Sequence, residues 1–195
     1  MFTGIIETIG QIIEIKEEGT NKHFTVESAI SNEFKIDQSV AHNGCCLTVV
    51  ELEGNKHTVT AIKETLDKTN LGDWKVADIV NIERCMPAHG RFDGHIVQGH
   101  VDQTAECISI TEENGSWEFR FKFNPDGENV LVSKGSVTVN GTSLTVVNPT
   151  ETEFSVCIIP YTYEQTIFKT MKIGDKINLE FDIIGKYVAK MMAKT

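Results

Sequence analysis

The chain repeats itself at an offset of about 97 residues, and this repeat restricts the possible folds more than any other feature of the sequence. The segment Ser39–Val50 aligns without a gap with Ser136–Val147, and eight of the twelve positions are identical. The same offset pairs Asn81 with Asn178. A repeat of this length predicts two copies of one structural unit.

A slightly shorter offset, about 95 residues, aligns Gly4–Glu7 with Gly99–Asp102 and marks the start of the second copy. We therefore expect two similar domains, residues 1–95 and 96–183, followed by a tail at residues 184–195. A length of 195 residues suits one ordinary domain or two small ones, without length for a large accessory region.

Alternation of apolar and polar residues predicts β-strands in both copies, as in Phe24–Glu27 and Trp117–Phe123. Turn signals such as Glu53-Gly54-Asn55 separate these stretches. The expected fold class is all-β. Two short segments, Lys63–Leu71 and Thr162–Met171, fit about a turn of helix better than a strand.

The tail is predicted to be helical. In the segment from residue 183 to residue 195, Tyr187, Met191 and Met192 recur at helical spacing.

Charge and apolar runs exclude several classes of function. Eighteen Lys and Arg against 28 Asp and Glu give a net charge of −10, the wrong sign for binding nucleic acid or anionic membranes. No run approaches the roughly twenty apolar residues of a membrane helix. The opening Met1–Gly4 lacks the basic start of a signal peptide. We expect a cytoplasmic protein whose five cysteines are free thiols.

The two copies differ in their reactive side chains. Where the first copy has Cys46 the second has Ser143, and where the second has His100 the first has Ile5. Two like domains offer two like pockets. The divergence indicates that one site binds while another also does chemistry, or that two halves of different molecules complete one site.

The vicinal pair Cys45-Cys46 begins a predicted strand, so the two thiols point to opposite faces of the sheet. A thiol close to the basic neighbour His42 can act as a nucleophile. It can equally serve as a small buried hydrophobic side chain. Both interpretations remain open on this pattern.

Three histidines, His89, His95 and His100, lie within one short stretch. On an extended strand His95 and His100 would lie about 16 Å apart on opposite faces, which argues against a shared metal ion. His100 and Asp102 would share a face, an arrangement that can tune an imidazole for proton transfer. A surface histidine is the alternative.

A resemblance to a known family rests on five motifs. They are Met1–Ile6, Asn43–Val49, Lys63–Leu66, Gly94–Asp102 and Val139–Val146. With them the chain, from its start to about residue 190, resembles riboflavin synthase of the α-chain type, a family of lumazine-binding repeats. The resemblance implies two tandem, similar six-stranded Greek-key β-barrels and a short C-terminal helix that gathers three subunits into a homotrimer.

The resemblance also implies the reaction, the last step of riboflavin biosynthesis. Two molecules of 6,7-dimethyl-8-ribityllumazine exchange a four-carbon unit, giving riboflavin and 5-amino-6-(D-ribitylamino)uracil, without a cofactor or a metal. The site would form between the first barrel of one subunit and the second barrel of its neighbour.

The family's substrate-binding residues correspond to two sets in this chain. In the first barrel they are Gly4, Ile5, Ile6, Ser39, Cys46, Leu47, Thr48, Thr60, Ala61, Ile62, Lys63, Glu64 and Thr65. In the second barrel they are His100, Val101, Asp102, Lys134, Ser143, Leu144, Thr145, Ile158, Ile159, Pro160, Tyr161, Thr162 and Tyr163, with Asp182 beside them.

The reaction that the resemblance implies needs a base for the C7 methyl proton of one lumazine and a nucleophile at C7 of the other. We assign the base to His100. Cys46, Ser39 or a water that they position can supply the nucleophile, and the sequence does not rank them. Asp182 would orient a base or that water.

Lumazine proteins are the main alternative, since these monomeric fluorescent carriers have the same fold and ligand without catalysis. The presence of Cys46, Ser39 and His100 together favours the enzyme. A purely structural β protein would not explain the unlike halves.

Assembly is the point at which the chain departs most from the family. The segment after residue 183 is short for the family, so we expect weak trimer contacts through Tyr187, Met191 and Met192. Some family members also associate with lumazine synthase, which makes it a candidate partner.

Overall fold

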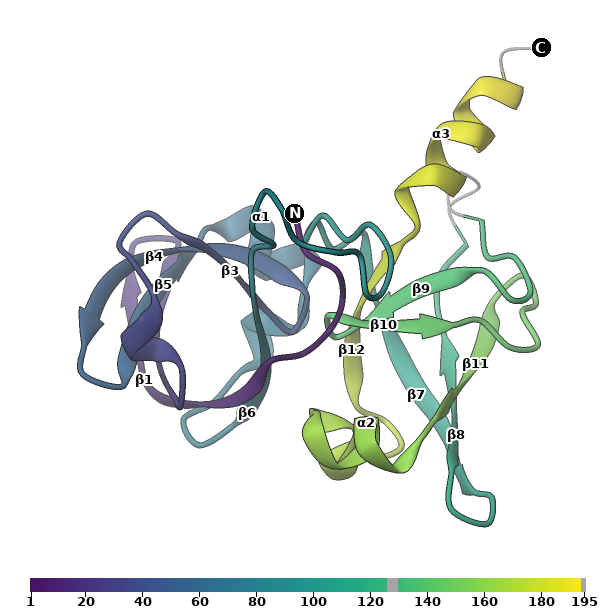
Figure 1. Cartoon of the computed structure of the whole chain (residues 1–195), viewed down its shortest axis with the longest axis horizontal. Coiled ribbons are helices and arrows are strands. Elements are labelled where there is room, and N and C mark those ends of the chain that lie inside the picture. The colour runs from purple at the N-terminus through teal and green to yellow at the C-terminus, as the bar shows by residue number, and fades with distance from the viewer. Residues whose placement is uncertain (126–129, 194–195) are drawn as a thin grey trace.

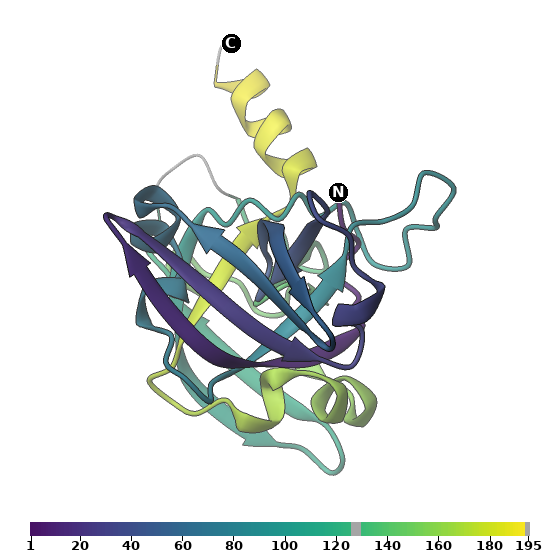
Figure 2. The ribbon, with the colours of Figure 1, turned by 90° about the vertical axis from the view of Figure 1, so that its left-hand side faces the viewer.

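In a computed structural model of the chain, which describes residues 1–125 and 130–193, the first half forms a closed six-stranded barrel. Figure 2 turns this barrel toward the viewer. Its strands pair in the order β1-β2-β5-β4-β3-β6, and every pair is antiparallel. They are β1 (Thr8–Glu18), β2 (Asn21–Ser28), β3 (Ser39–His42), β4 (Cys45–Glu53), β5 (Lys56–Ala61) and β6 (Ile79–Arg84).

The second half repeats this plan beside the first (Figure 1). Its six strands pair in the order β10-β9-β12-β7-β8-β11, which is the order of the first barrel with one join missing. The strands are β7 (Gln103–Glu112), β8 (Trp117–Lys122), β9 (Ser136–Val139), β10 (Thr142–Thr145), β11 (Glu153–Ile158) and β12 (Lys176–Phe181). The all-β prediction is confirmed.

The missing join lies between β10 and β11, where one bridge between Val147 and Ser155 replaces a full ladder. The reason is local. Asn148 has a positive φ of 46°, and Pro149 follows without the N–H that a strand residue would donate. Strand β10 therefore ends after four residues, whereas β4 continues for nine.

Short helices follow β5 and β11 in both halves, as the sequence predicts. They are α1 (Lys63–Lys68) with the 3-10 turn η2 (Asn70–Asp73), and α2 (Pro160–Gln165) with η3 (Ile167–Thr170), while a further 3-10 turn, η1 (Ser31–Glu33), follows β2. The predicted terminal helix is α3 (Ile183–Met192), and it projects away from both sheets (Figure 1). Residues 194 and 195 of that prediction lie outside the described residues.

Each half has its own apolar core, because alternate residues of every strand face inward. In β8, for example, Phe119 and Phe121 are fully buried while their neighbours are not. Within the described residues no helix is long and apolar enough to cross a membrane.

Two tight turns, one from each half, lie with their backbones in close contact. Asn43 and Gly44 connect β3 to β4, Asn140 and Gly141 connect β9 to β10, and all four residues have positive φ. A Cβ atom on Gly44 would lie 2.6 Å from the backbone nitrogen of Gly141. A Cβ atom on Gly141 would meet the nitrogen of Gly44 at 2.7 Å. Only glycine permits this approach.

Two equivalent asparagines, fully buried in the last strand of each half, bond these turns crosswise. The Asn81 side-chain amide donates to the Asn140 carbonyl at 2.9 Å. The Asn178 side-chain amide donates to the Asn43 carbonyl, also at 2.9 Å. Buried amides with satisfied bonds fix the orientation of the two halves, because any other docking would leave them unpaired.

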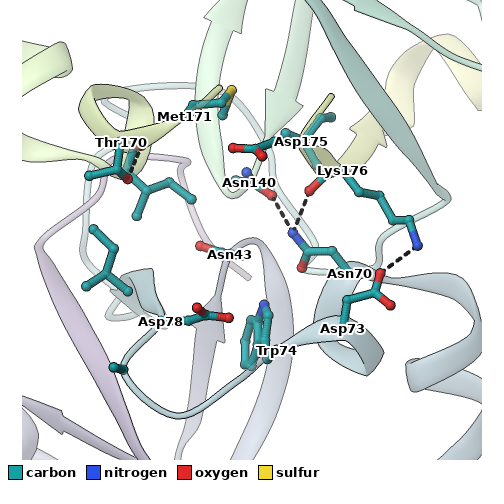
Figure 3. A pocket seen from close by; sticks show the side chains of 14 residues that line it. Asn43, Asn70, Asp73, Trp74, Asp78, Asn140, Thr170, Met171, Asp175 and Lys176 are labelled. Atoms are coloured by element: carbon teal, nitrogen blue, oxygen red, sulfur yellow. Dashed lines mark hydrogen bonds and ion pairs between the residues drawn. The ribbon is translucent and has the colours of Figure 1, made fainter. Parts of the chain in front are cut away.

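The other atom of each amide is also used across the boundary. Asn178 Oδ1 accepts the Asn70 N–H at 2.7 Å, and Asn81 Oδ1 accepts the Ile167 N–H at 2.9 Å. The Asn70 side-chain amide in turn donates to Asn140 Oδ1 (Figure 3). The turns η2 and η3 are thereby tied to the opposite half.

The first half also buries a histidine pair that the second half lacks. His42 Nε2 lies 2.7 Å from His57 Nε2, and His57 Nδ1 lies 2.7 Å from Ser31 Oγ. At the equivalent positions the second half carries Val139 and Phe154. Burial lowers the pKa of both imidazoles, that of His57 to about 4.

We predict that Gly44→Ala lowers the free energy of unfolding by at least about 3 kcal/mol, because it adds a clash with Gly141 to the cost of a positive φ. The matched control is Gly54→Ala, since Gly54 has a φ of 60° and nothing within 4 Å of its Cβ position. The control should lose only about 1 kcal/mol, the cost of the left-handed conformation. Equal losses in urea denaturation would show that the turn contact is unimportant.

The histidine pair predicts an acid-sensitive stability. Because the imidazole pKa values are lower in the folded state, the unfolded chain binds more protons below about pH 6.5. Relative to a His42→Val/His57→Phe variant, the parent should lose at least about 3 kcal/mol of unfolding free energy between pH 7 and pH 4, the part that comes from His57 alone. Parallel stability curves for the two proteins would contradict this assignment.

Candidate active site

The segment before β7 crosses to the first barrel. Gly99, with a φ of 79°, accepts the N–H of Cys46 at 2.9 Å through its carbonyl. A Cβ atom on Gly99 would lie 2.7 Å from Cys46 Cβ. Two residues later, Val101 packs against the core of the first barrel. The chain near His100 therefore belongs spatially to the site at Cys46.

The segment before β1 makes the equivalent crossing in the other direction. The Gly4 carbonyl accepts the N–H of Ser143 at 2.8 Å. A Cβ atom on Gly4 would lie 2.6 Å from Ser143 Cβ. The two crossing segments also bond each other, since Phe2 and Val97 exchange two backbone hydrogen bonds at 2.7 and 3.1 Å.

These crossings correct the grouping expected from the sequence. Gly4–Ile6 was assigned to the first barrel's pocket and His100–Asp102 to the second barrel's. Gly4 instead lies against Ser143 of β10, and Gly99 and Val101 lie against the first barrel. The expectation was wrong because it assumed that each repeat folds only on itself.

Cys46 is half-buried, whereas Cys45 faces the core, so the predicted opposite directions of the two thiols are confirmed. Burial raises the pKa of Cys46, and a hydrogen bond with the Ser39 side chain opposes that rise. Burial raises the pKa of Cys45 to about 12. Cys46 is thus a protonated thiol paired with a hydroxyl, and a nucleophile here needs a base to take its proton.

His100 is exposed, but its predicted partner is used elsewhere. The Asp102 carboxylate accepts the N–H of Phe181 at 2.9 Å and pairs with Lys186 Nζ at 2.6 Å. Moreover, the chain from residue 91 to residue 102 forms no strand, so the shared-face argument fails. Asp102 fastens the crossing segment to α3 instead.

His95 lies beside Ser143, although the sequence named it only in connection with a metal site that its spacing argued against. Its Nδ1 lies 2.7 Å from Ser143 Oγ, and its Nε2 lies 3.2 Å from Thr138 Oγ1. Burial lowers the pKa of His95, and the charge of Asp182 opposes this. A hydroxyl–imidazole pair therefore lies at Ser143 of the second half, with its imidazole supplied by the segment before β7, whereas the first half sets Cys46 with Ser39.

Asp182 has a structural role as well. Its Oδ1 accepts the N–H of Ile184 at 2.9 Å and so caps the start of α3. Lys134 has a positive φ of 68°, and its N–H donates to the Val146 carbonyl.

The other expected binding residues occupy equivalent places in the two halves. Leu47 and Thr48 lie on β4, Thr60 and Ala61 end β5, and Ile62, Lys63, Glu64 and Thr65 lead into or lie on α1. Leu144 and Thr145 lie on β10, Ile158 ends β11, and Ile159, Pro160, Tyr161, Thr162 and Tyr163 lead into or lie on α2. Ile5 and Ile6 lead into β1. Many of these side chains are exposed or half-buried, as open ligand walls require.

A cavity of about 530 Å³ opens beside the segment before β1, which crosses to the second half. Thr3, Ile5, Gln38, Glu83 and Cys85 are among the residues that line it. Ile5 is an expected binding residue and is 46% exposed. This volume lies in the range of small-molecule pockets.

A second cavity, of about 430 Å³, lies between the halves near η2 and η3 (Figure 3). Its acidic side chains have internal partners: Asp73 pairs with Lys176, and Asp78 and Asp175 accept the backbone N–H groups of Lys75 and Lys172. Asn70 Oδ1 is buried and has no hydrogen-bond partner among the described residues. Within residues 1–125 and 130–193 no three His, Cys, Asp or Glu side chains lie together as a metal site would require.

Comparison with protein families gives two matches along the chain. The model of the lumazine binding domain matches residues 3–85 and again residues 98–182. Both matches coincide with the two repeated sheets.

Known relatives match over the whole chain. Riboflavin synthase of Actinobacillus pleuropneumoniae is 42% identical over 195 residues, covering 100% of this chain and 91% of the relative. Riboflavin synthase of Bacillus subtilis (strain 168) is 43% identical with the same coverage. Riboflavin synthase of Escherichia coli (strain K12) is 38% identical over 186 residues, covering 93% of this chain and 87% of the relative.

Solved structures agree in fold. LumP complexed with riboflavin superposes with a TM-score of 0.85 at 24% identity, covering 93% of this chain and 99% of that one. LumP complexed with 6,7-dimethyl-8-(1'-D-ribityl) lumazine gives 0.84 at 22% identity, covering 92% and 98%. With two lumazine binding domains and full-length relatives of this similarity, the chain belongs to the riboflavin synthase family.

Proposed function

We propose that the protein is a riboflavin synthase, a transferase that converts two 6,7-dimethyl-8-ribityllumazine molecules into riboflavin and 5-amino-6-(D-ribitylamino)uracil. The observation that carries this proposal is full-length identity of 42–43% to riboflavin synthases. The lumazine-binding domains would be residues 1–95 and 96–183, each completed by the crossing segment of the other.

The unlike halves suit a reaction between two identical molecules that take different roles. At one place Cys46 lies with Ser39, and at the other Ser143 lies with His95, which comes from the segment joining the two halves. Holding two flat heterocycles together makes their condensation effectively unimolecular, which is worth roughly 7–11 kcal/mol in good cases. Threonines at equivalent places, such as Thr48 and Thr145, supply hydroxyls for the polar edges and the ribityl chain.

We assign the proton transfer to the imidazole of His100. His100 is exposed beside Cys46 and takes the C7 methyl proton of one lumazine. The nucleophile at C7 of the other is Cys46, Ser39 or a water between them. Because the Cys46 pKa is raised, a water activated at this hydroxyl–thiol pair is as well supported as the thiol itself.

A non-catalytic carrier is the second candidate, favoured by the superposition on LumP. Incubation of the purified protein with 6,7-dimethyl-8-ribityllumazine alone separates the two. We expect loss of the lumazine spectrum and the appearance of riboflavin. Tight binding with unchanged lumazine fluorescence would instead establish a carrier.

We predict that His100→Gln lowers kcat by about 100-fold, the usual contribution of a general base. Cys46→Ser should lower it by about tenfold, because a hydroxyl can still position the water. Cys157→Ser is the control, since Cys157 is exposed on β11. Near-normal turnover of folded His100→Gln and Cys46→Ser proteins would refute the assignment.

Assembly into a homotrimer through α3 is part of the same proposal. Tyr187, Met191 and Met192 on this helix are 68%, 72% and 73% exposed, and Ile184 extends the apolar surface. Apolar side chains this exposed on one helix favour burial against other copies. Lumazine synthase remains a candidate partner.

We predict that Tyr187→Glu/Met191→Glu converts a trimer into a monomer in sedimentation experiments, because buried carboxylates oppose helix association. The control, Lys172→Glu, changes an exposed residue just before β12, whereas α3 follows the other end of that strand. A monomeric parent, or a variant of unchanged mass, would contradict the role of α3.

A further inference from the structure

A buried carboxylate in the last strand of the second half holds the segment that crosses to the first barrel. Glu180, which is 3% exposed, accepts the N–H of Gln98 at 2.7 Å through Oε1. Its Oε2 accepts the N–H groups of Gly99 and His100, each at 2.9 Å. Three consecutive peptide groups thus converge on one side chain.

The equivalent carboxylate in the first half holds the other crossing segment. Glu83, 5% exposed, accepts the N–H of Thr3 at 2.7 Å and the Thr3 hydroxyl at 2.9 Å. It also accepts the N–H of Gly4 at 3.0 Å. Glu83 and Glu180 are 97 positions apart, the offset of the repeat itself.

Each carboxylate accepts the N–H of a glycine whose carbonyl accepts a hydrogen bond from the opposite half. Gly99 donates its N–H to Glu180 and accepts from Cys46 through its carbonyl. Gly4 donates its N–H to Glu83 and accepts from Ser143. The position of each crossing segment against a strand of the opposite half therefore depends on a carboxylate from the half to which the segment itself belongs.

We propose that Glu180 and Glu83 are positioning residues that act crosswise: Glu180 of the second half sets the ligand site at Cys46, and Glu83 of the first half sets the ligand site at Ser143. This inference rests on the proposed function, because it takes both places to bind flavin-like ligands. Neither carboxylate needs to touch the ligand.

A carboxylate is better suited than an amide to this task. It offers only acceptors, whereas glutamine would direct its NH₂ at peptide N–H groups and lose at least one bond. The groups that face Glu180 are Lys186 on α3, Asp102, and the thiols of Cys45 and Cys46. Burial raises the pKa of Glu180 to about 7, while the N–H groups and Lys186 favour the charged form.

A merely structural role would have a different signature. If the two carboxylates only stabilised the fold, replacing either would lower stability and disturb both ligand sites alike. If they act crosswise, each replacement disturbs one site, and that site lies in the opposite half.

The experiment measures how well riboflavin protects a thiol at each site from iodoacetamide, read by mass spectrometry of the labelled peptides. Cys46 reports on the first site. A Ser143→Cys substitution, present in every protein compared, reports on the second with the same chemistry. Glu180→Gln and Glu83→Gln are each made in this full-length background, and protection is the ratio of labelling rates without and with riboflavin.

We expect Glu180→Gln to reduce protection at Cys46 by at least tenfold and leave position 143 within twofold. Glu83→Gln should do the reverse. Should a glutamine variant fail to fold, Glu180→Asp and Glu83→Asp, which keep the charge on a shorter side chain, give the same crossed comparison. Uniform effects at both sites, or none, would overturn the crosswise role.

The parent protein separates this proposal from the proposed function. Protection of both thiols in the parent supports the two ligand sites on which the inference depends. Absence of protection at both would overturn the ligand assignment, and the positioning roles with it.

Discussion

The contact of Gly44 with Gly141 sets the position of everything else, because two backbones can approach this closely only where neither carries a Cβ atom. The buried amides of Asn81 and Asn178 then bond each turn to the opposite half. Once these groups are satisfied, the halves have one relative orientation. Only in that orientation do the segments before β1 and before β7 reach strands of the opposite half.

The exchange of segments explains how a repeated fold can build two different sites. Each half contributes a strand end, at Cys46 or Ser143, and receives a glycine carbonyl from the other half. Divergence then needs few changes, since the thiol and hydroxyl of one site and the hydroxyl and imidazole of the other sit on the same scaffold. A reaction in which one substrate molecule donates a four-carbon unit to an identical molecule requires two unlike sites.

Much of this architecture follows from the sequence, but the site does so only in part. Strand alternation and the repeat predict the all-β halves, and vicinal cysteines on a strand predict that the two thiols point to opposite faces of the sheet. The location of Gly4 and His100 could not be predicted, because strand patterns do not encode which half a leading segment pairs with. His95 was missed as a site residue for a related reason: its partner Ser143 is distant in sequence, and no local pattern marks the pair. The pairing of Asp102 with Lys186 likewise depends on the first turns of α3 lying beside the segment before β7, which no local pattern marks.

We propose that each ligand site is made from both halves of the chain, and a crystal structure with riboflavin bound would test this. We expect one ligand that contacts β4 together with the His100 segment, and another that contacts β10 together with the Gly4 segment. Ligands enclosed by the residues of a single half, with the crossing segments out of contact, would contradict it.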